Sequence, residues 1–283
     1  MRLTICAVLL TCWAVCAQER TVGEGVNLYS IQKEAALGAQ MAEEVRQSTT
    51  PVHSAAVREY VERIGLRLAA QFPDAAFQYS FSVIADAAGG QIHEPLSLPG
   101  GYIFVPAGLI LTAQNDAEFA GMLAHAMAHV AARHGTRQAS RSDIAVFLHL
   151  PLVFMGGWTG TRPAGNEGAA PLSFLKLQRG YEIEADVLAI KSMAAAGYAP
   201  EALLRYIDRT QTESTTTPKV FSVLPQRDAR MSGLKETIQG LSPETYTLTN
   251  EISAIQAEVP RVPPDREPRR PLLKRQDGEP RGR

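Results

Sequence analysis

The stretch Leu123-Ala124-His125-Ala126-Met127-Ala128-His129 carries the most informative pattern in this chain, because two histidines lie four residues apart within it. At 3.6 residues per turn, positions i and i+4 project from one face of a helix. Both imidazoles can therefore reach a single metal ion, and imidazole nitrogen is a common ligand of zinc. Periodic apolar residues around the pair predict a long helix over residues 116–134, with Gly135 as its stop.

The residue after the first histidine is the unusual feature of this pattern. In the zinc motif His-Glu-x-x-His, that residue is a glutamate that takes a proton from water at the metal. Here the position holds Ala126. Removal of a general base costs about 10²–10⁴ in rate, so the pattern predicts lost or strongly reduced hydrolysis and leaves slow hydrolysis open.

A third metal ligand is predicted downstream, within Glu182-Ile183-Glu184-Ala185-Asp186. Glu182 and Asp186 are again four residues apart, so one carboxylate can bind metal while the other holds a ligating imidazole in its tautomer. Glu184 should point off that face of the helix. Spacing alone favours a zinc site and a surface helix with scattered acidic residues about equally.

The remaining histidines have simpler interpretations. His134, near the end of the long predicted helix, is expected to be a favourable positive charge at the negative end of the helix dipole. His53, His93 and His149 lack partners at ligand spacing and are interpreted as surface or packing residues.

Composition and charge limit the classes of function. The 283 residues are 45% apolar and carry a net charge of −1, which favours one globular domain with appendages and argues against nucleic-acid binding. Residues 259–283 differ from the rest, with eight Lys or Arg against four Asp or Glu and almost no large apolar residues. We expect this Pro/Arg-rich tail to be disordered.

The first 17 residues have the pattern of a secretory signal peptide. Arg2 precedes an apolar run over residues 3–15, and Val15-Cys16-Ala17 resembles a cleavage site. That run is shorter than the roughly 20 residues of a membrane-spanning helix, while Cys16 leaves lipid attachment as an alternative. The predicted organisation is a signal peptide at 1–17, a domain at 18–258 and the tail at 259–283, in a periplasmic or secreted protein.

Other segments predict a mixture of helices and short strands. Residues 77–84 alternate and are rich in aromatic and branched side chains, which favours a strand. A second strand over residues 96–105 is interrupted by the turn signal Pro99-Gly100-Gly101. Further helices are predicted near residues 30–48, 55–70, 174–195 and 200–212.

Residues 29–230 resemble the zinc metallopeptidase family that includes the heat-shock protease HtpX, the CAAX prenyl protease and the periplasmic outer-membrane assembly protease BepA. The motifs that carry this resemblance occur in order along the chain: Leu98-Pro99-Gly100-Gly101-Tyr102-Ile103-Phe104-Val105, Gly108-Leu109, Glu118 to His125, Arg179, Glu182 to Asp186, and Ala195-Ala196-Gly197-Tyr198-Ala199-Pro200. The similarity is closest to the soluble periplasmic members.

The resemblance implies a fold and a set of site residues. The fold would be α+β, a mainly helical zincin-like domain with a small sheet at the edge of the cleft. His125, His129 and Glu182 match the zinc ligands, and Asp186 matches an aspartate behind them. Substrate-binding positions would be Pro99, Gly100, Gly101 and Arg179.

The chain also departs from the family pattern at three places. Ala126 stands at the catalytic glutamate, Glu94-Pro95 replaces an Asn-Ala pair beside the substrate edge, and Leu224-Pro225 replaces a His-Pro pair. A proline cannot donate a hydrogen bond to an added strand, which should weaken peptide binding there.

These patterns together predict a function. We expect a zinc-binding homologue whose proteolysis is lost or strongly reduced. Such a protein would hold a polypeptide client or regulate active relatives. Peripheral contact with the membrane or with envelope proteins is a further alternative. The alternatives are an active zinc metalloendopeptidase acting on misfolded or envelope proteins, and a structural protein in which zinc ties two helices together.

Overall fold

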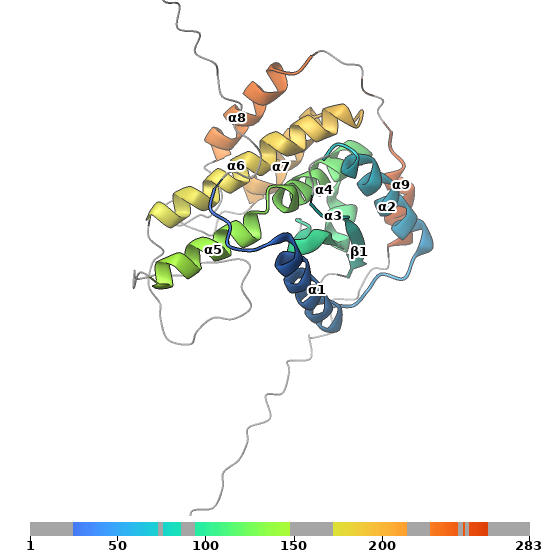
Figure 1. Cartoon of the computed structure of the whole chain (residues 1–283). Helices are drawn as coiled ribbons and strands as arrows, with labels where there is room; N and C mark the ends of the chain where they lie inside the picture. Colours follow the sequence, from blue (N-terminus) through green and yellow to red (C-terminus); the bar gives the residue numbers. More distant parts are fainter. Residues whose placement is uncertain are drawn as a thin grey trace, which may run out of the picture.

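The structure is a computed structural model that describes residues 25–72, 76–85, 94–147, 172–213, 227–242, 246 and 249–259 (Figure 1). Several expectations from the sequence concern residues outside these ranges: the signal peptide, the tail beyond residue 259, His93, His149 and Leu224-Pro225. Among the described residues, no helix combines the length and apolar character that a membrane crossing requires.

The described residues form a mainly helical α+β domain, as predicted. In chain order the elements are α1 (Ile31–Ser48), α2 (Ala55–Ala69), β1 (Ser80–Ile84), β2 (Leu96–Leu98), the 3-10 turn η1 (Pro99–Gly101), β3 (Tyr102–Pro106), α3 (Ala107–Thr112), α4 (Asp116–Ala131), α5 (His134–Phe147), α6 (Leu172–Ala195), α7 (Glu201–Glu213), α8 (Arg227–Gln239) and α9 (Ile252–Glu258).

The sheet is small and has the order β1-β3-β2. β1 runs parallel to β3, with Ser80 opposite Tyr102, and β2 runs antiparallel to β3, with Leu96 opposite Phe104. The turn η1 reverses the chain between β2 and β3, and it needs glycine because Gly100 and Gly101 have φ values of 80° and 96°. The predicted strand interruption is therefore a hairpin turn, and β2 lies at an edge of the sheet.

Helix α4 lies at the centre of the core. It packs against α6, α7 and α2, and Figure 1 shows it between α6 and α2. Apolar side chains such as Phe119 and Leu123 are fully buried on it, each contributing roughly 1.5–3 kcal/mol by leaving water. At Gly121, an added Cβ would meet Leu203 at 3.0 Å and Met193 at 3.2 Å, so glycine allows α6 and α7 to approach closely.

The end of α4 differs from the prediction. The helix ends at Ala131, and a second helix, α5, begins at His134 with Gly135 inside it. Between them Arg133 has a φ of 55°, the left-handed conformation that ends helices. Gly135 is therefore not the stop, and the break comes at a non-glycine residue.

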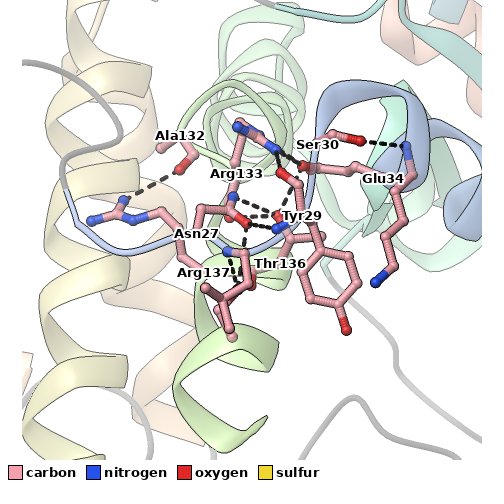
Figure 2. Close-up of polar contacts among 11 residues, drawn as sticks. Asn27, Tyr29, Ser30, Glu34, Ala132, Arg133, Thr136 and Arg137 are labelled. Atoms are coloured by element: carbon pink, nitrogen blue, oxygen red, sulfur yellow. Dashed lines mark hydrogen bonds and ion pairs between the residues drawn. The ribbon is translucent and has the colours of Figure 1, made fainter. Parts of the chain in front are cut away.

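Contacts with the N-terminal segment hold Arg133 in place. Its Nε donates to Glu34 Oε2 at 2.7 Å and its Nη2 donates to the carbonyl of Tyr29 at 2.6 Å. Thr136, in the first turn of α5, donates to the same Glu34 oxygen at 2.9 Å and accepts from Asn27. Figure 2 shows this segment lying against the α4–α5 junction, so residues about a hundred positions earlier stabilise the break.

Two helices that the sequence did not predict lie near the C-terminal end of the described chain. The N-terminus of α9 is held by Asp116, whose carboxylate accepts from the backbone N–H groups of Ile252 at 2.7 Å and Glu251 at 3.1 Å. The other unpredicted helix, α8, packs on α6 and α7. Both depend on partners distant in sequence, which explains why local patterns missed them.

Candidate metal site

The histidine pair and the downstream glutamate meet where α4 packs against α6. The Nε2 atoms of His125 and His129 lie 3.1 Å apart. The carboxylate of Glu182 lies 3.4 Å from the first of these nitrogens and 3.6 Å from the second. One ligand atom from each of the three residues falls within 4.8 Å of the others.

These separations fit the chemistry of zinc. A tetrahedral zinc ion with bonds of about 2.0–2.1 Å places its ligand atoms about 3.3–3.4 Å apart. The two histidine nitrogens are 3.1 Å apart, and the Glu182 carboxylate approaches His125 through Oε2 at 3.4 Å and His129 through Oε1 at 3.6 Å, all close to that value. Two imidazole nitrogens and one carboxylate are also a donor set that zinc accepts in hydrolytic sites. The three residues can therefore hold zinc without large rearrangement.

Burial is uneven across this cluster. The His125 side chain is 5% exposed, whereas those of His129 and Glu182 are 20% and 18% exposed. Among the described residues, no fourth His, Cys, Asp or Glu joins the group. Structural zinc is usually held by four protein ligands, whereas catalytic zinc keeps one position open. The cluster thus resembles an open site.

Asp186 and Arg230 lie behind His125. The Nδ1 of His125 is 2.9 Å from Asp186 Oδ1, and Arg230 donates to both oxygens of that carboxylate, through Nε at 2.5 Å and Nη2 at 2.7 Å. Arg230 is not among the site residues that the sequence predicted. The structure shows it anchoring the carboxylate that faces the first histidine.

The electrostatics of the site favour positive charge between the carboxylates. Burial lowers the pKa of His125, but the Asp186 and Glu182 carboxylates outweigh it and raise that pKa to about 10. Burial raises the pKa of Glu182, yet contacts with His125 and His129 hold it well below its usual value. The metal-free site therefore contains an imidazolium between two carboxylates, an arrangement that a cation can replace.

His134 does not carry the positive charge that the sequence predicted at the end of the helix. It is 3% exposed, and burial, assisted by the charges of His129 and Arg137, outweighs Glu184 and lowers its pKa to about 4. The imidazole is therefore neutral at physiological pH and is not the positive charge expected at a helix end. A helix break at residue 133 was needed to turn this side chain inward, and no local pattern signalled that break.

The residues predicted to bind substrate lie on the η1 turn and on α6. The η1 turn packs beneath α1, where a Cβ on Gly38 would lie 1.7 Å from the Pro99 carbonyl oxygen, and it also faces Gly135 of α5. Arg179 is half-buried on α6, one turn before Glu182. Their role in binding remains a prediction.

Two positions at which the sequence departs from the family pattern, Ala126 and Pro95, are buried in the structure. Ala126 is buried, 2% exposed, directly after His125 on α4. Pro95 is buried and immediately precedes the edge strand β2, while Glu94 beside it is exposed.

Comparisons with known proteins find several similar proteases. The chain is 23% identical to the beta-barrel assembly-enhancing protease of Yersinia pestis over 230 residues, which is 76% of this chain and 46% of that protein. It is 24% identical to a putative beta-barrel assembly-enhancing protease of Vibrio cholerae over the same coverage. The mitochondrial metalloendopeptidase OMA1 of Saccharomyces cerevisiae is 30% identical over 112 residues, 40% of this chain and 32% of that protein.

This chain spans less than half the length of these relatives. A family model, described as peptidase family M48, matches residues 55–238. That segment contains the sheet, both histidines, Glu182, Asp186 and Arg230. The chain therefore belongs to peptidase family M48 and has a metallopeptidase scaffold.

Proposed function

We propose that this chain is a zinc-binding member of the family whose proteolysis is lost or strongly reduced, and that it holds polypeptides or regulates active relatives. The observation that carries the proposal is the convergence of His125, His129 and Glu182 at spacings suited to zinc, beside an alanine at the general-base position. The ligands are retained while the proton acceptor is missing.

Zinc, when bound, supplies Lewis acidity toward water and carbonyl oxygen. The remaining step, removal of a proton, needs a base within reach. The Ala126 methyl group cannot serve, and the carboxylates nearest the site already have partners. Glu182 belongs to the ligand set, Asp186 is paired with Arg230, and Glu184 is paired with His134 and Arg137. None of these groups is placed as a spare base.

The two alternatives make different predictions about this site. A working endopeptidase would need a base from the substrate or from another residue, and the pairing of the neighbouring acids disfavours the latter. A purely structural zinc site would be closed by four protein ligands, whereas the described residues supply three and leave two of them partly exposed. The retained open position favours a site that meets a ligand.

The proposed location is the periplasm or the cell exterior. It is supported by the signal-like residues 1–17 and by the similarity to proteases named for enhancing beta-barrel assembly. A polypeptide client or substrate, with peripheral contact to the membrane or to envelope proteins, is the corresponding proposed partner.

Metal analysis tests the first half of the proposal. Purified protein should contain, or take up, one zinc per chain, and zinc should raise its melting temperature by mass action. The double variant His125→Ala/His129→Ala should lose both effects, while His53→Ala should keep them. A wild-type chain that neither binds zinc nor gains stability from it would overturn the proposal.

Protease assays test the second half. Unfolded casein is incubated with the zinc-loaded wild type, with Ala126→Glu and with Ala126→Gln, which adds similar bulk but no base. We expect measurable cleavage only with Ala126→Glu, at least about 10²-fold above the other two. Melting curves check that the variants at this buried position fold. Turnover by the wild type at the rate of Ala126→Glu would contradict the loss of proteolysis.

A further inference from the structure

A second cluster of polar side chains touches the metal site from the side opposite its ligand atoms. His134 Nδ1 lies 3.0 Å from His129 Nδ1, and His134 Nε2 lies 3.1 Å from Glu184 Oε2. These contacts form a chain of polar groups. It runs from the carboxylate of Glu184 through the rings of His134 and His129 to the Nε2 of His129, the atom that faces Glu182 and His125.

The carboxylate at one end determines where each proton lies. An ionised carboxylate only accepts hydrogen bonds, so Nε2 of a neutral His134 must carry the proton that points at Glu184. The Nδ1 of that ring is then an acceptor, and His129 must donate its Nδ1–H to it. Only one nitrogen of a neutral imidazole carries a proton. The Nε2 of His129 is consequently left with a free lone pair.

Neighbouring side chains stabilise this chain of polar groups. Arg137 donates to the Glu184 oxygen that faces His134, at 3.2 Å, which favours the ionised carboxylate. The ring of Tyr181 stacks on His134 with centroids 4.6 Å apart and an angle of 26°. Helix α6 thus supplies the stacking ring, the ligand Glu182 and the anchor Glu184 within about one turn.

We propose that His134 and Glu184 are positioning residues that fix the tautomer and orientation of His129, so that its Nε2 is presented to the metal. This inference rests on the zinc site of the proposed function. The two ligand histidines are then oriented by different partners. His125 contacts the Asp186–Arg230 pair, and His129 contacts His134, which in turn contacts the Glu184 carboxylate. Loss of such an outer partner costs about 10- to 100-fold in metal affinity.

Zinc titration against a chromophoric chelator tests this proposal. His134→Phe keeps an aromatic ring against Tyr181 but removes both nitrogens, and it should weaken zinc binding about 10- to 100-fold. Glu184→Leu should weaken it in the same direction. The matched control is His53→Phe, the same exchange at a histidine outside the cluster, and it should bind zinc within about twofold of the wild type.

The tautomers can be read directly in the wild-type protein by nitrogen-15 NMR of the imidazole side chains. We expect a proton on Nε2 of His134 and on Nδ1 of His129, with and without zinc. A proton on Nδ1 of His134 would overturn the proposal, and this measurement decides it even if His134→Phe fails to fold.

The outcomes separate the two proposals. Absence of zinc binding by the wild type overturns the proposed function and this inference with it. Tight binding by both the wild type and a folded His134→Phe leaves the zinc site standing and overturns only the positioning role. Weakened binding by His134→Phe, with the expected tautomers, supports both.

Discussion

Arg230 and Asp186 form a buried ion pair in which the guanidinium contacts both oxygens of the carboxylate, at 2.5 and 2.7 Å. Both side chains are at most 3% exposed. The carboxylate in turn lies 2.9 Å from Nδ1 of His125, so α8 is connected to the metal site through α6. This relationship makes Arg230, which lies about 50 residues after the ligand Glu182 on α6, a determinant of the site.

Removing Arg230 should destabilise the fold strongly. Arg230→Met leaves the Asp186 carboxylate buried without its cation, and such a change costs about 3–5 kcal/mol. Urea unfolding measures the loss. The control is Arg63→Met, which breaks another two-oxygen Arg–carboxylate pair, at 2.7 Å from Glu251 on the surface, where about 0–1 kcal/mol is expected. Similar losses at the two positions would refute the importance of burial here.

Zinc binding should release a proton. In the metal-free protein the pKa of His125 is raised to about 10, so near pH 7.5 the imidazolium must lose its proton before Nε2 can bind metal. Apparent zinc affinity should therefore rise with pH up to about 10. Calorimetry in buffers of different ionisation enthalpy should report about one proton released per zinc. Asp186→Asn removes one carboxylate and should reduce that release; an unchanged value would count against the assigned cause.

The break between α4 and α5 should depend on Glu34. This carboxylate is buried and accepts from Arg133 and Thr136. Glu34→Ala leaves both donors without that partner, and hydrogen bonds to charged groups contribute about 1.5–3 kcal/mol. We expect a loss of that size in urea unfolding, with faster amide exchange at the start of α5. Glu43→Ala, on the exposed face of α1, should change stability little. Unaltered exchange at His134 would show that the junction does not need Glu34.

Asp116 should make stability depend on acid. Burial raises its pKa, but hydrogen bonds from Thr249, the Ile252 backbone and Tyr60 outweigh this and leave the pKa lowered. A depressed folded-state pKa stabilises the fold above the unfolded-state value near 3.9, and that stabilisation is lost as pH falls through the folded-state value.

The corresponding variant is Asp116→Asn. At pH 7 it should be less stable than the wild type by about 1–3 kcal/mol, and the difference should shrink below pH 4. Urea unfolding at pH 7 and pH 3 measures both values. A difference that stays constant between these pH values would show that the charge of the carboxylate is not responsible.

Much of the fold could be predicted where local patterns dominate. Ser30 and Ser54 cap α1 and α2 close to the predicted starts, because capping is a contact over three residues. The turn at Gly100-Gly101 was recognised from its residues for the same reason. Strand β1 begins at Ser80, later than predicted, because pairing with β3 rather than strand propensity sets its length. The short helix α9 was missed because Asp116, whose carboxylate accepts from its first N–H groups, is far away in sequence.

The sequence by itself determined that His125 and His129 share one face of a helix, since that follows from the 3.6-residue period. It also determined the family, through ordered motifs that the match over residues 55–238 confirms. Only the tertiary structure decided that Glu182 reaches the same point, because this depends on how closely α6 packs against α4.

The tertiary structure likewise decided the partners behind each histidine. Arg230 reaches Asp186 from another helix, and His134 contacts His129 directly after Arg133, whose left-handed conformation is accompanied by contacts with the N-terminal segment. Such contacts join residues as far as 104 positions apart. They are set by packing and burial, which no local periodicity records.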